Sequence, residues 1–273
     1  MLCGGEEGIR QAVAGNLGNL TSREGLCALT DGRGGARQAH WQRLKTPQNQ
    51  LIAGLPAKTR NSLLGLADSV ELTLSQVVCD ADVPTRHVYF PVGSFISLVA
   101  AVQDSPGVEV GMIGAEGMLG AALALGVATN PLRAVVQGPG MAWRIKAQDF
   151  RAELKRSTSL QHAVSRYLYV LMCQHATSAV CLRFHPIGQR LARWLLMSQD
   201  RAHSTRFHIT HEFLAYMLGV RRVGITNAAT ALQRLGLIDY QRGEIHVVDR
   251  AGLETSACAC YKAERKIYAD LLG

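Results

Sequence analysis

The sequence predicts an α+β protein in which a strand-rich N-terminal part precedes one long helix and a mixed C-terminal part. Three observations lead to this prediction. Short apolar runs separated by glycine and proline occupy residues 51–155, and an uninterrupted helical pattern occupies 157–183. A pair of helical patterns followed by a hairpin signal then occupies 210–248.

The composition indicates a globular cytoplasmic protein. Of the 273 residues, 48% are apolar and 18% are charged. No run of about 18 uncharged apolar residues is present, and no secretory signal pattern opens the chain, so we expect no membrane association. The seven cysteines form an odd set without a regular spacing, which suits a reducing compartment.

The positive charge is concentrated toward the C-terminus. The formal net charge is +2 over residues 1–46, −1 over 47–155 and +7 over 156–273. A basic C-terminal part is expected if that part binds a polyanion, although a basic face alone is common in soluble proteins.

We expect residues 1–46 to be a disordered extension and residues 47–155 to form an antiparallel β-roll. The extension is rich in glycine and has no apolar period. Folding should begin with short helices over 49–66, and the alternating run Val70–Val78 predicts one half-buried strand. Five more strands are expected at 87–90, 94–102, 108–113, 134–137 and 141–145, with a short helix inside 114–126.

Residues 156–184 are predicted to be a dimerisation helix. Apolar residues recur at spacings of three and four, and no proline or glycine interrupts 157–183. The segment Tyr167–Met172 is apolar on every side. One face can therefore cover the roll while another contacts the same helix of a second chain, although a core helix without a partner remains the alternative.

Residues 185–273 are predicted to contain two closely packed helices, a hairpin and a terminal helix near 253–272. Thr210 is a suitable N-cap, and Gly219 lies at a sharp turn that favours positive φ. Ala215 is small where a second helix must cross, and the apolar spacing around it is typical of a helix-turn-helix.

The second of these helices, Arg221–Leu235, is expected to enter the major groove of DNA. Arginine matches the paired acceptors of guanine, asparagine matches adenine, and threonine reaches a base or a phosphate. The exposed candidates are Arg221, Arg222, Gly224, Thr226 and Asn227, with Thr210 at the preceding helix.

The turn Gln241–Glu244 joins two strand-like runs and predicts a hairpin, so the domain is a winged helix. Arg242 would lie at the wing tip, beside a phosphate.

In this order, a roll, a long helix and a winged helix resemble the Crp–Fnr superfamily of bacterial transcription regulators. The resemblance covers about residues 49–272 and is most specific at Leu218–Arg222. It implies a cyclic-nucleotide-binding-like roll, a homodimer, double-stranded DNA as partner and RNA polymerase as a possible further partner. It also implies that Arg222 reads a base. The next position, often Glu in the family, is Val223, and Asn227 replaces a later basic residue, so the half-site sequence is open.

The same resemblance points to Glu116 and Arg133 as candidate effector-binding residues in the roll. The family binds the ribose through a Gly-Glu-Leu segment and the cyclic phosphate through arginine beside a hydroxyl group. Here Glu116 precedes Gly117, and Arg133 follows Pro131 and Leu132 without a hydroxyl neighbour. We therefore expect no cofactor, and binding of cyclic AMP is doubtful.

No metal site and no enzyme activity are expected. The pair Cys258 and Cys260 is more often structural than metal-binding, although His208 and His211 could in principle complete a zinc site. His87 is the only histidine in 47–155, too few for a cupin-like metalloenzyme. The alternative function is a protein-docking or effector-binding module whose winged helix is not used for specific DNA binding.

Overall fold

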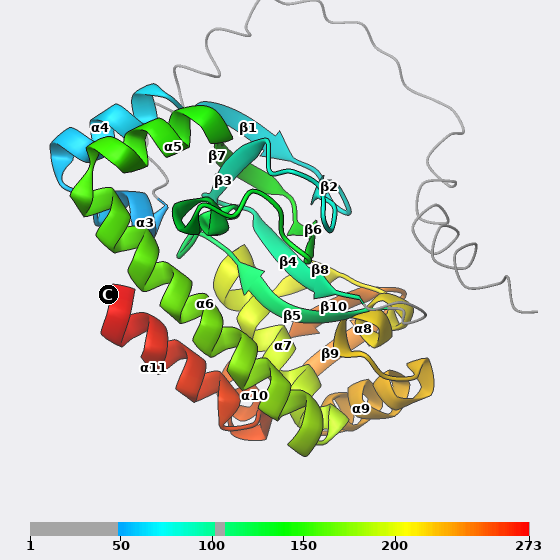
Figure 1. Cartoon of the computed structure of the whole chain (residues 1–273). Helices are drawn as coiled ribbons and strands as arrows, with labels where there is room; N and C mark the ends of the chain where they lie inside the picture. The colour runs from blue at the N-terminus through cyan, green and yellow to red at the C-terminus, as the bar shows by residue number, and fades with distance from the viewer. Residues whose placement is uncertain (1–48, 102–106, 273) are drawn as a thin grey trace, which may run out of the picture. The chain divides into compact units, whose positions relative to one another are not determined.

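The computed structural model describes residues 49–101 and 107–272 (Figure 1). The extension expected at 1–46 lies outside the described residues. The α+β class and the predicted order of roll, long helix and winged helix are confirmed.

The N-terminal part is a roll of antiparallel strands preceded by two short helices. Asn49 caps the first helix by accepting a hydrogen bond from the backbone N–H of Ile52 (3.2 Å). The elements are α3 Gln50–Ala53, α4 Ala57–Gly65, β1 Asp68–Leu72, β2 Val77–Cys79, β3 His87–Pro91, β4 Phe95–Ala100, β5 Val108–Ile113, the 3-10 helix η1 Ala121–Leu125, β6 Arg133–Gly138 and β7 Gly140–Lys146.

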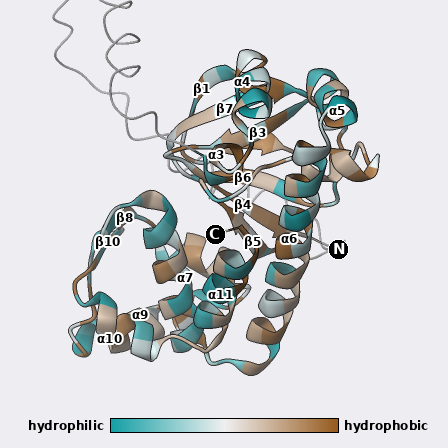
Figure 2. Ribbon diagram, turned by 90° about the vertical axis from the view of Figure 1, so that its left-hand side faces the viewer, coloured by the Kyte–Doolittle hydropathy of each residue, from teal (hydrophilic) through white to brown (hydrophobic). Residues whose placement is uncertain are grey.

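The strands form two sheets that share one core. The first sheet has the order β1-β7-β3 and the second β2-β6-β4-β5, with every pairing antiparallel. Leu72 and Ala142 from the first sheet pack with residues such as Ile96 and Val136 from the second. Figure 2 shows hydrophobic residues concentrated on the strands of this roll.

The single strand expected over Val70–Val78 is wrong, because the chain turns in its middle. Ser75 has a φ of +64°, and the side chain of Gln76 accepts a hydrogen bond from the N–H of Thr73 (3.0 Å). β1 and β2 consequently belong to different sheets. The residues alternate in polarity through the turn, so periodicity does not detect it.

Two helices connect the roll to the C-terminal part: α5 Ala147–Arg156 and α6 Thr158–Phe184. The predicted long helix is confirmed within one residue at each end. Ser157 caps α6 by accepting from the N–H of Leu160 (3.2 Å). One side of α6 contacts β5 and η1, and Figure 1 shows α11 lying alongside it.

The C-terminal part consists of packed helices and a three-stranded antiparallel sheet of order β8-β10-β9. Its elements are α7 Ile187–Ala202, β8 Arg206–His208, α8 His211–Leu218, α9 Arg222–Arg234, β9 Ile238–Gln241, β10 Glu244–Val247, α10 Arg250–Ser256 and α11 Cys260–Leu272. The single terminal helix expected near 253–272 is therefore two helices, separated at Ala257–Ala259.

Arg190, buried on α7, and Arg250, partly exposed on α10, connect these elements. Arg190 donates a hydrogen bond to the carbonyl oxygen of Leu218 at the C-terminal end of α8. Arg250 bonds Asp200 (2.7 Å) on α7 and the hydroxyl of Tyr261 (2.7 Å) on α11. Among the described residues, no helix is both long and apolar enough to cross a membrane.

Candidate nucleic-acid interface and sensor pocket

The helices α8 and α9 meet at a sharp turn whose geometry matches the prediction. Thr210 Oγ1 accepts a hydrogen bond from the N–H of Phe213 (3.2 Å) and so caps α8. Gly219 has a φ of +60°, and a Cβ there would lie 3.0 Å from a methyl carbon of Val108. Both the positive φ and the contact with β5 favour glycine at this turn.

Apolar residues fix the angle between the two helices. Leu214 and Leu218 of α8 are buried against Ile225 and Ala228 of α9, and all four share a core with α7. Ala215 is 7% exposed, as expected for a small residue where helices cross closely. The inner faces are thus occupied, and the remaining face of α9 is open.

The N-terminal end of α9 presents polar side chains to solvent. Arg221 precedes the helix, Arg222 is its first residue, and both are exposed together with Asn227. Neither arginine forms an ion pair within residues 49–101 and 107–272. Val223, next to them, is 62% exposed. These groups are free to bind an anionic or hydrogen-bonding partner.

Gly224 differs from the other candidates of the recognition helix. Gly224 is half-buried, and a Cβ at this position would lie 2.7 Å from Cδ1 of Ile187 on α7. A larger residue here would require the end of the Ile187 side chain to move. The contact of Gly224 with DNA stays a prediction.

Thr226 belongs to a small network that the sequence did not reveal. Its hydroxyl donates to the carbonyl oxygen of Arg222 (3.2 Å) and lies 3.1 Å from Nδ1 of His211. The ring of His211 stacks on that of Tyr240, with centroids 4.2 Å apart. Burial and the nearby Arg222 lower the pKa of His211, which favours the neutral ring. His211 thus links α8, α9 and the wing.

The wing tip is a two-residue turn between β9 and β10. Arg242 has a φ of +49° and Gly243 a φ of +87°, which is the backbone of a type I′ hairpin turn. Arg242 is exposed and forms no ion pair with any described residue. The predicted placement of this guanidinium at the wing tip is therefore seen in the structure.

The basic residues of the C-terminal part divide into two groups. Arg193, Arg201 and Arg250 form ion pairs with acidic residues and stabilise the fold. A second group is exposed and has no ion-pair partner among the described residues: Arg206, Arg221, Arg222, Arg234 and Arg242. These five arginines lie on and around α9, β8 and the wing, while Lys262, which is also exposed and outside the ion pairs of the described residues, lies on α11.

Residues 189–256 match the family model of the Crp-like helix-turn-helix domain. Three solved structures are similar over most of their own length. A Crp/Fnr-family regulator from Eubacterium rectale is 15% identical, with a TM-score of 0.61, covering 76% of this chain and 96% of its own. FixK2 from Bradyrhizobium japonicum is 14% identical, with a TM-score of 0.60, covering 71% and 98%.

The third structure is the c-di-GMP-responsive regulator CLP of Xanthomonas campestris, which is 16% identical, with a TM-score of 0.58 and coverage of 70% and 99%. A search of curated protein sequences finds no match. Residues 189–256 thus match the Crp-like helix-turn-helix domain, and the described fold is similar to that of these solved Crp/Fnr-family regulators. The resemblance identified from the sequence is confirmed.

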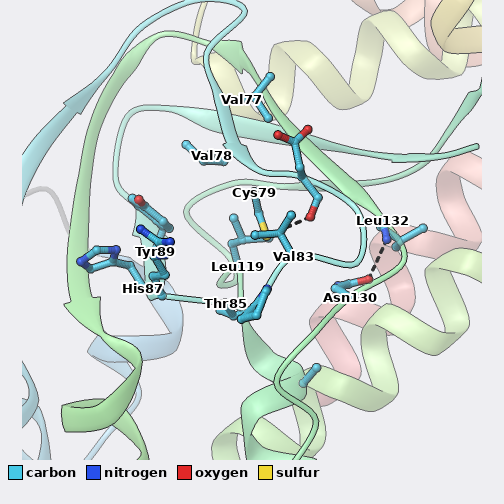
Figure 3. Close-up of a pocket in the computed structure, with 15 residues that line it drawn as sticks. Val77, Val78, Cys79, Val83, Thr85, His87, Tyr89, Leu119, Asn130 and Leu132 are labelled. Carbon is cyan, nitrogen blue, oxygen red and sulfur yellow. Dashed lines mark hydrogen bonds between the residues drawn. The ribbon is translucent and has the colours of Figure 1, made fainter.

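The roll contains a pocket of about 220 Å³ between β2, β3, η1 and the start of β6 (Figure 3). Its wall combines apolar and polar groups, with Val78, Tyr89 and Leu119 among the apolar lining residues. Thr85 and Asn130 add polar groups, and Asn130 Oδ1 accepts from the N–H of Leu132 (2.9 Å).

Glu116 does not line this pocket. Its Oε1 accepts hydrogen bonds from Nε of Arg201 (2.8 Å) and from the N–H of Gly114 (3.1 Å). The pKa of Arg201 is raised overall. Burial alone lowers this pKa, but the negative charges of Glu116 and Glu264 raise it by more. The segment expected to bind an effector therefore joins the roll to α7. Next to it, a Cβ on Gly117 would lie 2.2 Å from the hydroxyl of Tyr167 on α6.

Arg133 also lies outside the residues that line the pocket. Its Nε is 3.1 Å from Oδ1 of Asp80, and the two side chains are 42% and 59% exposed. Asp80 itself lines the pocket and adds negative charge there. The structure thus does not bring Glu116 and Arg133 together at a common binding site.

A half-buried acid, Glu109, lies where β5 faces α7. Ser97 Oγ donates to Oε2 of Glu109 (2.5 Å), and Arg193, Arg201 and Trp194 are close by. Burial raises the pKa of Glu109 to about 7, although the serine and the two arginines act in the opposite direction. This carboxyl group therefore titrates near neutral pH.

Proposed function

We propose that the protein is a sequence-specific DNA-binding transcription regulator of the Crp–Fnr type that reads DNA as a homodimer through α9. The observation that carries this proposal is the exposed, unpaired pair Arg221 and Arg222 at the start of α9. In a helix-turn-helix, the N-terminal residues of the second helix contact base edges.

Each exposed side chain fits a particular contact. Arg222 is suited to the two acceptors of guanine. Asn227, five residues further along α9, is suited to adenine. Thr210 and Arg242 flank α9 and are suited to phosphate oxygens. Thr226 is oriented by His211 and positions the start of the helix.

An exposed apolar face of α6 supports a homodimer. Tyr169, Met172, Val180 and Phe184 are 57%, 67%, 50% and 69% exposed and lie on one side of the helix. Their spacings of three, eight and four residues match an α-helical stripe. The opposite side, including Tyr167, is buried against the roll. A second copy of α6 would cover the stripe and place two recognition helices about 34 Å apart on the duplex.

We further propose that the roll does not bind cyclic AMP in the way usual for the family. Glu116 forms an ion pair with Arg201, and Arg133 lies outside the pocket, beside Asp80. A negatively charged phosphate in the pocket would also face Asp80, and the one arginine that lines the pocket, Arg86, is exposed to solvent. A regulator with another effector, or with none, fits this arrangement.

A DNA-binding titration tests the proposal. Labelled duplex from the protein's own upstream region is compared with scrambled duplex by fluorescence anisotropy, with and without cyclic AMP. We expect preference for the upstream duplex that cyclic AMP does not change. Preference that appears only with cyclic AMP would contradict the account of the roll. Equal binding to both duplexes by a chain that is monomeric in solution would favour the protein-docking alternative.

A further inference from the structure

Four side chains with metal-ligating atoms meet at the C-terminal end of α6. Cys181 is in the last turn of that helix and His185 follows its end. Cys258 lies in the connection from α10 to α11, and Cys260 is the first residue of α11. One ligand atom from each residue lies within 4.8 Å of the other three. The residues come from positions up to 79 apart in the sequence, so the fold brings them together.

The distances match the edges of a tetrahedral metal site. Cys181 Sγ and Cys258 Sγ are 3.5 Å apart, and Cys260 Sγ is 3.5 Å from Nδ1 of His185. Zinc bonds of about 2.3 Å to sulfur and about 2.0 Å to nitrogen place two sulfurs about 3.8 Å apart and a sulfur and a nitrogen about 3.5 Å apart. Only small movements are needed for all four atoms to bind one ion.

Burial and the number of ligands distinguish this cluster from ordinary core cysteines. Cys181, Cys258 and Cys260 are 2%, 5% and 7% exposed, and none forms a disulfide. A closed site with four protein ligands is typical of structural zinc, whereas a catalytic site keeps one position open. The cluster also includes the polar imidazole ring of His185, which packing of an apolar core would not require.

The surroundings supply compensating charge. Three thiolates, one neutral imidazole and Zn²⁺ carry a net charge of −1. Arg190 and Arg193 of α7 border the same small cavity as Cys181. Buried guanidinium groups near the ligands stabilise such an anionic centre, as outer groups do in other metal sites.

We propose that Cys181, His185, Cys258 and Cys260 bind one structural zinc ion. The sequence alone predicts no metal site, and it offers only His208 and His211 as residues that could in principle complete one with Cys258 and Cys260. His208 instead lies 2.6 Å from Glu244, and His211 is in the network of α9. The ion would join the end of α6 to the α10–α11 connection, beside the entry to α7 at Pro186.

Metal content tests the site without any use of DNA, so it is independent of the proposed function. The full chain is purified under reducing conditions from zinc-supplemented cells, and its metal is measured by mass spectrometry. We expect about one zinc per chain. Cys258→Ser combined with Cys260→Ser should lose at least about nine-tenths of it. Cys173→Ser is the matched control, because Cys173 lies on α6 outside the cluster, and it should retain the ion.

A second measurement uses the wild-type chain, so it does not depend on whether the double-serine variant folds. Metal is removed from the wild-type chain with a chelator, Co²⁺ is added, and the absorption spectrum is recorded. Tetrahedral cobalt with thiolate ligands should give intense visible bands in the wild type and in Cys173→Ser. A folded wild-type chain with no bound zinc and no such bands would overturn the proposal. A Cys181–Cys258 disulfide or a bound iron–sulfur cluster would overturn it as well.

Discussion

Replacing Glu116 with glutamine should destabilise the protein, because this residue neutralises an arginine that has almost no access to water. The side chain of Arg201 is 7% exposed and that of Glu116 16%. Removing the charge of one partner from a buried ion pair costs about 3–5 kcal/mol. Glutamine keeps a hydrogen-bond acceptor, and Glu264 remains 3.8 Å from Arg201, so the expected loss is about 2–3 kcal/mol.

Asp68→Asn is the matched control, because it also removes one carboxylate from an ion pair in the roll. Its partner is Arg144 at 3.2 Å, but the two side chains are 68% and 36% exposed. Exposed ion pairs contribute at most about 1 kcal/mol. Both free energies of unfolding are measured by urea denaturation at neutral pH. If Glu116→Gln and Asp68→Asn have the same stability, the Glu116–Arg201 pair does not join the roll to α7 as described.

Three further predictions concern pH, assembly and the turn of the helix-turn-helix. The pKa of Glu109 is raised from 4.5 to about 7 in the folded protein. The contribution of this group to the free energy of unfolding should therefore be greatest below pH 4.5. It should fall by up to about 3 kcal/mol as the pH rises to 7. Glu109→Gln should remove this loss in urea titrations at several pH values, and Glu71→Gln, on an exposed residue, should not. Met172→Glu should convert the dimer to a monomer in light scattering, while an unchanged mass would contradict the role of the α6 stripe. Gly219→Ala should lower the free energy of unfolding by about 1–2 kcal/mol because of its positive φ. Gly188→Ala, in an open position on α7, should not lower it.

The sequence predicts the helix-turn-helix well because local signals there agree with tertiary packing. The cap at Thr210, the positive φ at Gly219 and the turn at Arg242 each follow from residue chemistry. The long helix is predicted equally well, because no breaker interrupts Thr158–Phe184. In these segments, residues close in sequence determine the structure.

The errors arise where distant residues decide the outcome. The alternation of polar and apolar residues continues through Ser75, so it does not reveal the turn there. The turn is stabilised by a hydrogen bond from the N–H of Thr73 to the side chain of Gln76. Glu116 was interpreted from a family motif, whereas its actual partner, Arg201, is 85 residues away. Gly224, whose contact with DNA stays a prediction, faces the side chain of Ile187 on α7, a neighbour that its sequence position does not reveal.

The cysteine cluster shows the same limitation. The close pair Cys258 and Cys260 is visible in the sequence, but neither Cys181 nor His185 has a spacing that connects it to that pair. Only the packing of α11 against α6 places them together. The spacing of four residues between Cys181 and His185, at a helix end before proline, is the one signal that could have found them.

The central claim is that α9 reads base sequence, and the selectivity of Arg222→Ala tests it most directly. The ratio of affinities for specific and scrambled duplex is measured for wild type, Arg222→Ala and Arg151→Ala. Arg151 is an exposed arginine of α5 in the roll, so its variant loses the same charge. We expect Arg222→Ala to lose about 1–3 kcal/mol of specific binding and to relax selectivity, while Arg151→Ala keeps the wild-type ratio. An unchanged ratio for a folded Arg222→Ala variant would contradict the account.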